Sequence, residues 1–339
     1  MKTYREFVSK FNKELKKYLL KEERRYRKEF PQSIYLFTAL KEFVLSGGKR
    51  IRPYLIYLGY LSAQNKRPKK EVFFTCIAYE LLHNFALVHD DIVDNSEKRR
   101  GGKTLHKILG SDEREGISLA MLAGDIYWAL ANSLIIKIKT KYKKEILSHW
   151  FVLQNEVVRG EAEEFVFGTK GLKGIKKKDV INLAIKKSAN YSFAYPLLLG
   201  TLLGERPSLA KTLFGIGQKL GIAFQIKDDL LLYEWGETGE KDIDVDLREG
   251  RMNLIIYFVL KEDPKILKLR KVFGNFKASA SDLAKLRASI KKTRALQRAR
   301  KEAERYIEQA KQEILSLNIN HLIKNEYFNI INKILTRNK

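Results

Sequence analysis

One short segment of the chain gathers several acids beside several bases. The segment LVHDDIVDNSEKRRGG, residues 87–102, contains Asp90, Asp91 and Asp94, and a pair of arginines follows them. On an α-helix, Asp90 and Asp94 would share one face, where two like charges repel each other unless a cation lies near them. Carboxylate oxygens favour Mg²⁺, which typically takes its remaining ligands from water and substrate phosphates. The pattern predicts a magnesium site for a phosphorylated ligand, with a solvated acidic helix end as the alternative.

A second pair of acids ends another apolar run. Asp228 and Asp229 lie in QIKDDLLLY, which resembles the sequence around Asp90. Two such walls, each bearing metal, could clamp one diphosphate between them. In both copies an apolar helix leads into a charged rim, which suits a ligand with an apolar tail and an anionic head.

Two groups of bases accompany the acids. The motif GGKRIRP places Lys49, Arg50 and Arg52 after a glycine pair and before a proline, as in a loop that binds an anion and leads into a helix. It lacks the GxxxxGK[ST] pattern of a P-loop. Arg99 and Arg100 carry planar guanidinium groups, which suit bidentate contacts with phosphate. These bases predict the binding of anionic groups beside the metal site.

Helical periodicity dominates the elements that must position these residues. Apolar residues recur at three- and four-residue spacing, for example over residues 4–19 and 296–314. Few segments alternate as a half-buried strand would, and Gly/Ser-rich linkers are absent. We therefore predict one all-α domain spanning residues 1–339.

Composition narrows the class of protein. Lys and Arg outnumber Asp and Glu by 65 to 40, which suits a polyanionic partner, but the lysines are scattered and favour solvated faces. A single cysteine, Cys76, excludes an intramolecular disulfide and a cysteine-based zinc site.

The charged first residues do not resemble a signal peptide. The apolar stretch 118–136 contains Asp125 and Asn132, as a buried core helix would. We predict a soluble, cytoplasmic protein with at most peripheral membrane contact.

The ordered motifs resemble one enzyme family. GGKRIRP, ELLHNFALVHDDIVDNSEKRRGGKTLH, MLAGDIYWALA, KKSA and FQIKDDLL…DVDLREGR occur in the order typical of the trans-isoprenyl diphosphate synthases, or polyprenyl synthetases. The likeness runs from about residue 40 to about residue 260. It implies an isoprenoid-synthase-type helical bundle around a deep apolar cavity, usually in a homodimer. It also implies head-to-tail condensation of isopentenyl diphosphate (IPP) with dimethylallyl, geranyl or farnesyl diphosphate.

The resemblance also implies a role for each residue that occupies a motif position. The implied metal ligands are Asp90, Asp91, Asp94, Asp228 and Asp229, with three Mg²⁺ per active site, two at the first motif and one at the second. The implied IPP ligands are Lys49, Arg52, His83 and Arg100. The implied ligands of the allylic diphosphate are Arg99, Lys187, Ser188, Gln225, Lys241 and Arg251. Asp90, Asp94, Asp228 and Lys187 are the expected catalytic residues.

Several positions depart from the family pattern. Leu232 replaces the third aspartate of the second motif, as in some synthases of C20 products, which could weaken the metal site there. Ser188 keeps the hydroxyl of a usual threonine, whereas Arg251 replaces a usual lysine and changes the geometry of the cation. Lys241 lies one position earlier than the familiar lysine. The segment GEAEEF, residues 160–165, carries glutamates where GQxxD is common, and the sequence gives no account of that change.

The apolar residues before Asp90 predict the product length. Phe85, Leu82 and Tyr79 lie five, eight and eleven positions before Asp90, roughly on one helix face, so Phe85 would lie about 7–8 Å below Asp90 and Tyr79 about 16 Å below it. A bulky side chain there would stop the growing chain, although plain core aromatics would look the same. With the small Ala86 and no insertion in DDIVD, the pattern resembles geranylgeranyl (C20) synthases. The farnesyl (C15) product is the next alternative.

Three other functions fit parts of the pattern. A terpene cyclase or head-to-head condensing enzyme needs no IPP clamp, so GGKRIRP, His83 and Arg100 argue against it. A weakly active subunit of a heteromeric prenyl synthase is supported only by Leu232. A nucleic-acid-binding protein would explain the formal charge of +25, but the paired acids would repel a phosphate backbone and no binding module is present. We expect no nucleic-acid partner.

Overall fold

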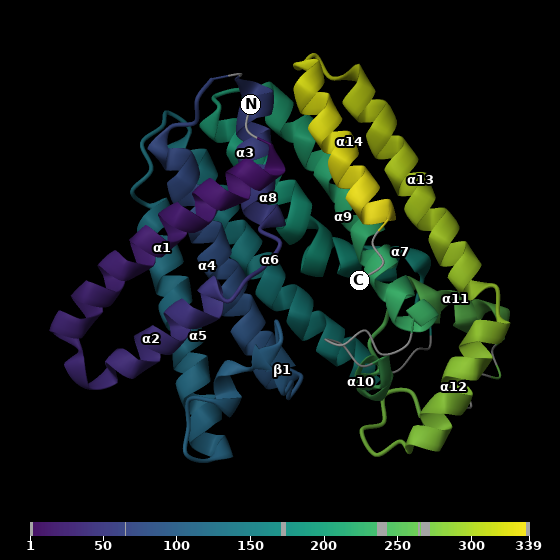
Figure 1. Ribbon diagram of the computed structural model, residues 1–339. Coiled ribbons are helices and arrows are strands. Elements are labelled where there is room, and N and C mark those ends of the chain that lie inside the picture. Colours follow the sequence, from purple (N-terminus) through teal and green to yellow (C-terminus); the bar gives the residue numbers. More distant parts are fainter. Residues whose placement is uncertain are drawn as a thin grey trace. The chain divides into compact units, whose positions relative to one another are not determined.

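The chain is built almost entirely from helices. The computed structural model describes residues 3–64, 66–170, 174–235, 243–263, 265 and 272–336. Over these residues the only strands are β1 (Lys98–Arg99) and β2 (Gly102–Lys103), so the all-α prediction is confirmed (Figure 1). The chain divides into two compact units, unit 1 (Met1–Leu147 with Gly200–Arg206) and unit 2 (Ser148–Leu199 with Pro207–Lys339). The single-domain organisation stays a prediction.

Unit 1 contains the first acidic motif and the GGKRIRP loop. Its helices are α1 (Tyr4–Glu29), α2 (Ile34–Leu45), α3 (Ile51–Ala63), α4 (Lys70–Val93) and α5 (Glu113–Ile135), with short 3₁₀ turns η1 (Pro31–Ser33) and η2 (Leu105–Lys107). A capping box between Thr3 and Glu6 starts α1. The helix then buries the stripe Phe7, Phe11 and Leu15, as the periodicity of the sequence predicts.

Helix α4 is the central element of unit 1. It packs against α3 and α5 and is apolar around most of its circumference, as expected of a helix with neighbours on several sides. The thiol of Cys76 is fully buried in it, in agreement with the role of a small core residue. Neighbouring helices pack against α4 along its length. This packing fixes the backbone positions of the acidic residues at its C-terminal end.

Two helices of unit 1 are long and apolar enough to cross a membrane by length and composition alone. The most apolar window of α4 is 61% buried within the protein, whereas that of α5 is 33% buried. The prediction of a buried core helix over 118–136 therefore needs a correction. Helix α5 buries one face, which includes Ala123 and Tyr127, but exposes Met121, Leu122 and Trp128.

Unit 2 contains the second acidic motif. Its helices are α7 (Lys177–Ala184), α9 (Pro207–Trp235), α10 (Ile243–Glu249), α11 (Leu254–Glu262), α12 (Ala280–Lys292), α13 (Ala295–Ser316) and α14 (His321–Leu335), while α6 (Lys143–Lys170) and α8 (Tyr195–Leu203) contribute residues to both units. Between α7 and α8 lies a π-helical segment, η3 (Ile185–Ala194). It packs on α9 with almost no separation, because a side chain at Gly217 or Gly221 would overlap the backbone of η3. These glycines fix η3 against the helix that carries Asp228.

Candidate active site

The first acidic motif lies at the C-terminal end of α4. Asp90 is in the last turn, and Asp94 caps the helix with its backbone amide donating to the Asp90 carbonyl at 2.8 Å. The two residues are thus one turn apart, as their spacing predicts. Asp91 lies on the other side, with its side chain only 1% exposed. Asp90 and Asp94 are therefore better placed than Asp91 to face a ligand from solvent.

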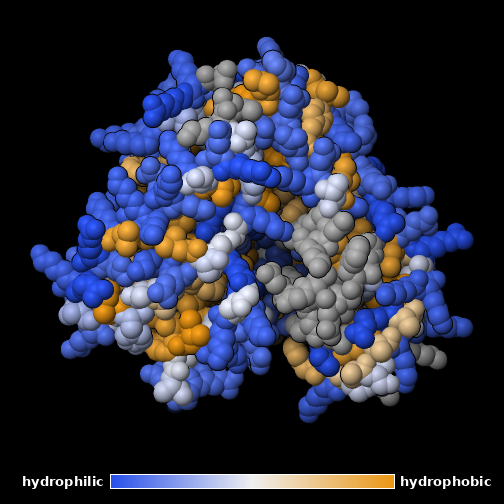
Figure 2. Space-filling view, viewed as in Figure 1, coloured by the Kyte–Doolittle hydropathy of each residue, from blue (hydrophilic) through white to orange (hydrophobic). Residues whose placement is uncertain are grey.

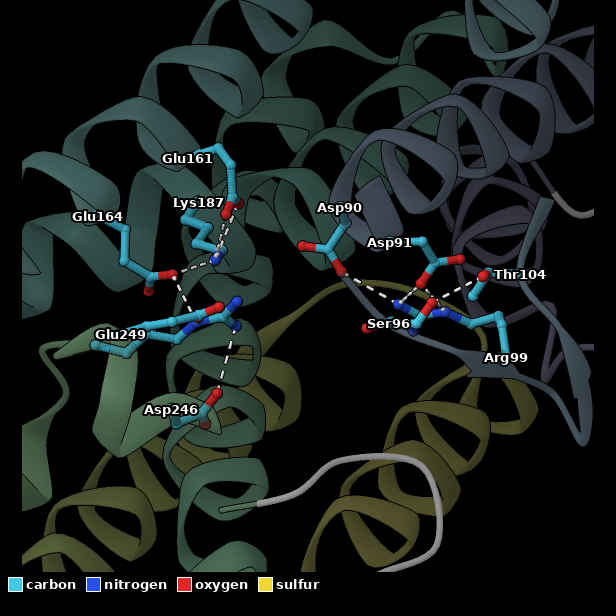
Figure 3. A network of polar contacts seen from close by, with 11 residues as sticks. Asp90, Asp91, Ser96, Arg99, Thr104, Glu161, Glu164, Lys187, Asp246 and Glu249 are labelled. Atoms are coloured by element: carbon cyan, nitrogen blue, oxygen red, sulfur yellow. Dashed lines mark hydrogen bonds and ion pairs between the residues drawn. The ribbon is translucent and has the colours of Figure 1, made fainter. Parts of the chain in front are cut away.

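Arg99 is held against this motif by a tight turn. Arg100 and Gly101 both have positive φ, as a two-residue hairpin turn requires, and the turn pairs Arg99 with Gly102 across β1 and β2. The guanidinium of Arg99 donates to Asp91 Oδ1 at 2.8 Å and to Asp90 Oδ2 at 3.3 Å (Figure 3). Burial raises the pKa of Asp91, and the hydrogen bond from Arg99 opposes that rise. Asp91 is thereby placed as the residue that orients Arg99.

Three of the four predicted IPP ligands are drawn together in unit 1. Arg52 Nη1 lies 3.0 Å from His83 Nε2. Arg100 donates to the Phe43 carbonyl at 3.1 Å, and it borders the glycine loop, because a Cβ added at Gly48 would lie 3.4 Å from its Nη2. Burial lowers the pKa of His83 well below its usual value, and the positive charges of Arg52 and Arg100 lower it further. His83 is a neutral ring among cations, an environment that favours an anion.

The fourth predicted ligand, Lys49, lies in the loop before α3. Its side chain is exposed, and its carbonyl accepts a hydrogen bond from the Tyr4 hydroxyl. The loop turns sharply here, since Gly47 and Gly48 have φ of 143° and 126°, a region open to glycine. Lys49 therefore sits on a constrained loop with a side chain that reaches solvent.

A buried polar relay supports this group of bases, and the sequence did not reveal it. Arg50 caps α3 in a left-handed conformation and forms an ion pair with Glu80, with both side chains at most 3% exposed. Asn84 donates to the Glu80 carboxylate at 3.3 Å, and its own carbonyl lies 3.4 Å from Arg100 Nη1. The relay Arg50–Glu80–Asn84–Arg100 thus joins the GGKRIRP loop to the turn at residues 99–102, the RRGG turn. Its signal in the sequence was an acid and an amide inside an apolar helix.

Unit 2 holds Lys187 between two carboxylates. Lys187 lies in the π-helical segment η3, a rare geometry that is frequent at functional sites. Its ammonium lies 2.9 Å from the Glu161 carboxylate and also donates to Glu164 (Figure 3). The backbone of η3 comes close to α6 here because Gly160 has no side chain. A Cβ at Gly160 would lie only 2.9 Å from the Lys187 Cα. Both glutamates that depart from GQxxD therefore bind the same lysine.

Arg251 extends this network. It lies 2.5 Å from Glu249, 3.5 Å from Asp246 and 3.9 Å from Glu164, so Glu164 is shared between Lys187 and Arg251. Two cations thus face four carboxylates over this part of unit 2. Ser188 follows Lys187 on η3 and is half-buried. Lys241 and the side chain of Leu232 lie outside the described residues.

The second acidic motif lies near the end of α9. Burial raises the pKa of Asp229 to about 8, and the negative charges of Asp228, Asp246 and Glu164 add to that rise. The amide of Gln225 donates to Asp229 at 2.9 Å and opposes it. Asp229 is therefore a proton-bearing acid at neutral pH in the absence of a cation. Such an excess of hard carboxylate oxygens is the donor set that Mg²⁺ prefers.

The metal fit is partial for each motif taken by itself. Over the described residues, no three His, Cys, Asp or Glu side chains converge on one point. Mg²⁺ is typically held by one or two carboxylates, with waters and substrate phosphates completing its shell. Asp90 with Asp94, and Asp228 with Asp229, each supply that number.

The three predicted chain-length residues differ in access. Tyr79 and Leu82 are 0% and 3% exposed and belong to the core of unit 1. Phe85 is half-buried, and its ring stacks obliquely on His89 with 4.5 Å between centroids. Gly124 of α5 lies close to the His89 ring, because a Cβ added at Gly124 would come within 2.5 Å of that ring. Of the three, Phe85 is the side chain that a ligand could meet first.

Comparisons with known proteins agree with these motifs. A family model described as polyprenyl synthetase matches residues 34–310. The geranylgeranyl pyrophosphate synthase of Geoglobus acetivorans is 31% identical over 82% of this chain and 84% of its own, and the geranylgeranyl diphosphate synthase of Sulfolobus acidocaldarius is 30% identical over 91% and 89%. A crystal structure of the geranylgeranyl pyrophosphate synthase of Corynebacterium glutamicum, with isoprenyl diphosphate and magnesium, matches 97% of this chain and 99% of that one, with a TM-score of 0.84 and 25% identity. The chain therefore belongs to the polyprenyl synthetase family.

Proposed function

We propose that the chain is a Mg²⁺-dependent trans-prenyltransferase that condenses IPP head-to-tail with allylic diphosphates and ends at geranylgeranyl diphosphate. The observation that carries this proposal is the cluster of bases around neutral His83. A diphosphate is the kind of anion that Arg52, Arg100 and an uncharged imidazole donor can bind together. The family and the names of the relatives support the same reaction.

We assign IPP to Lys49, Arg52, His83 and Arg100. The relay through Glu80 and Asn84 holds Arg100 while leaving part of its guanidinium fork for phosphate oxygens. A neutral His83 can donate one N–H to the diphosphate without adding to the repulsion among the arginines. These residues fix the diphosphate, so the IPP double bond has a defined position for attack.

Each unit carries residues that the family pattern assigns to the allylic diphosphate. In unit 1 these are Asp90, Asp94 and Arg99, with Asp91 as the residue that orients Arg99. In unit 2 these are Lys187, Ser188, Gln225, Asp228, Asp229 and Arg251, with Lys241 as a further expectation from the motif. Asp90, Asp94, Asp228 and Asp229 would hold Mg²⁺, three ions by the family pattern, and the metal would supply stabilisation of the negative charge on the diphosphate.

The chain's own residues act in three ways during the transfer. Arg99, Lys187 and Arg251 stabilise the charge that accumulates on the leaving diphosphate as the allylic C–O bond breaks. The IPP clamp holds the nucleophilic double bond near the resulting carbocation, so that a new C–C bond forms. A proton is then lost, and the released diphosphate accepts it. Apolar residues that exclude water protect the cation from hydrolysis.

We propose that Phe85 limits the product to C20. Its half-buried ring, fixed by His89, lies about 7–8 Å along the helix from Asp90 at the rise of an α-helix. Phe85→Ala should shift the main product to C25 or longer, while Leu82→Ala, at an enclosed position, should chiefly lower stability. Chromatographic sizing of the products checks this. If Phe85→Ala makes no longer chain than the wild type, Phe85 does not set the product length.

A direct assay separates this proposal from its alternatives. The protein is incubated with Mg²⁺, labelled IPP and the C5, C10 or C15 allylic diphosphate, and the products are sized. We expect C20 from each starter. A C15 end point would support the farnesyl alternative. No turnover with any starter would overturn the enzyme proposal and favour the subunit of a heteromeric synthase.

We also propose a cytoplasmic homodimer. In unit 1, helix α5 exposes Met121, Leu122 and Trp128 at 46%, 53% and 44%, which is a large apolar face for one helix. In unit 2, helix α6 likewise exposes Phe151, Val152, Val158, Phe165 and Val166. Light scattering would test the dimer, which should dissociate when Leu122 and Trp128 are both replaced by Asp.

A further inference from the structure

The outer face of α1 carries an unusual excess of positive charge. Opposite the buried stripe, nine exposed side chains of α1 are basic and two are acidic (Glu6 and Glu29). We call the nine bases the α1 basic face; they are Arg5, Lys13, Lys16, Lys17, Lys21, Arg24, Arg25, Arg27 and Lys28. Arg25 forms an ion pair with Glu29 at 2.9 Å, and the bases on this face outnumber its exposed acids by nine to two. Hydrophilic side chains dominate the surface over α1 (Figure 2).

A second amphipathic helix shows that this excess is not general. Helix α13 also buries one regular stripe, which includes Ala299, Ala303 and Ile307. Its exposed side chains include four bases and two acids, and Arg305 is paired with Glu302 at 2.9 Å. The lysine-rich composition of the chain therefore does not by itself produce a face like that of α1.

Aromatic side chains are exposed where the α1 basic face ends. Phe30 and Tyr35 flank the short turn η1 between α1 and α2, and they are 54% and 52% exposed. Arg27 and Lys28 lie three and two residues before Phe30. Bases in a row with aromatic rings at one end match a surface helix that lies on an anionic membrane, with the rings entering the headgroup region.

We propose that the α1 basic face, with Phe30 and Tyr35, docks the protein on an anionic lipid bilayer. The exposed rings favour lipid over nucleic acid, because both follow the bases in the chain and are not interleaved with them along the helix. The choice of lipid rests in part on the proposed function, since a C20 diphosphate is an amphiphile that partitions into bilayers. Docking would let the product pass to the membrane without crossing bulk water.

Vesicle sedimentation tests the proposal without any substrate, so its outcome is independent of the proposed activity. The full-length protein is mixed with vesicles of phosphatidylcholine alone or with 30% phosphatidylglycerol, at low and moderate salt. We expect binding to the anionic vesicles only, and we expect it to weaken as salt rises. A single-stranded oligonucleotide is titrated in parallel.

Matched variants locate the surface. In one variant, Lys13, Lys16, Lys17 and Lys21 are changed to Gln; in the control, Lys285, Lys291, Lys292 and Lys301, exposed on α12 and α13, are changed to Gln with the same loss of charge. Each base near an anionic surface contributes about 1 kcal/mol, so the first variant should lose at least about a hundredfold in vesicle partitioning, and the control much less. Phe30→Ser should reduce the partitioning further.

Equal losses in both variants, binding to neutral vesicles, or binding to the oligonucleotide alone would each overturn the proposal. Both variants should keep the prenyl transfer of the wild type, which verifies their folding.

Discussion

The surroundings of His83 in unit 1 and of Asp229 in unit 2 are opposite in charge. Around His83, arginines depress the pKa of the ring, so it stays neutral. Around Asp229, neighbouring carboxylates raise the pKa of the acid to about 8, so it keeps its proton. Bases are in excess in the first region, and carboxylates are in excess in the second. We therefore propose that one diphosphate can bind by bases alone, whereas the other requires Mg²⁺ as well.

The largest effect should follow from removing a carboxylate of the first motif. Asp90→Asn keeps the shape of the side chain but removes the charge that would bind Mg²⁺, so kcat should fall by about 10³-fold or more. Steady-state kinetics with saturating Mg²⁺ would measure it. Glu113→Gln, an exposed acid of α5, is the matched control and should change little. A fall in kcat of less than tenfold in Asp90→Asn would remove Asp90 from the metal site.

The base-rich region should depend on its one buried acid. Glu80→Gln leaves the enclosed Arg50 without its counter-charge, so the free energy of unfolding should fall by about 3–5 kcal/mol. Glu23→Gln, which breaks the more accessible pair with Lys41, is the control and should cost clearly less. Urea unfolding measures both. If the surviving Glu80→Gln protein binds IPP as the wild type does, the relay does not position Arg100.

The two regions predict opposite pH dependences of stability in metal-free protein. The raised pKa of Asp229 means that its contribution to stability is complete below pH 3.8 and is lost as the pH rises toward about 8. The lowered pKa of His83 means that its contribution is present above pH 6.5 and is lost as the pH falls. Urea unfolding is measured in EDTA from pH 5 to 9. Asp229→Asn should remove the loss of stability between pH 5 and about 8, by about 1–3 kcal/mol for this partly exposed residue, and His83→Gln should remove the loss of stability below pH 6.5. Unchanged slopes in both variants would contradict the comparison.

The smallest effect should come from Glu161, which shares Lys187 with Glu164. Glu161→Gln weakens one of the two carboxylate contacts, so the ammonium should be easier for a diphosphate to engage. We expect the KM for the allylic diphosphate to fall about two- to fivefold with kcat and the KM for IPP unchanged. Glu163→Gln is the control, because Glu163 lies on the same helix but pairs with the exposed Lys186 at 3.5 Å. An equal change in both variants would show that Glu161 acts only through general charge.

Much of the fold and the positions of the motifs could be predicted from local pattern. Helical periodicity gave the stripe of α1, and the four-residue spacing placed Asp90 and Asp94 one turn apart. The glycine pair before Lys49 marked a loop with positive φ. These features depend on residues near one another in sequence, so the sequence carries them directly.

The side-chain partners could not be predicted in the same way. The relay through Glu80 depends on packing between α3, α4 and the RRGG turn, and periodicity does not encode such pairs. The π-helical segment η3 packs closely against Gly217 and Gly221 of α9, and periodicity does not encode that contact. The glutamates at 161 and 164 were visible as departures from the family pattern, but their common partner, Lys187, is more than twenty residues away. Long-range contacts of this kind decide which acids face a ligand and which hold a base.

The central claim is that IPP binds to bases alone, whereas the allylic diphosphate requires metal. Calorimetric titration of IPP and of a non-ionising allylic diphosphate analogue, each in EDTA and in Mg²⁺, tests it most directly. We predict that IPP binds in EDTA with an affinity within about tenfold of that in Mg²⁺, and that the allylic analogue binds only when Mg²⁺ is present. Loss of IPP binding in EDTA, or equal binding of the allylic analogue in both buffers, would contradict this account.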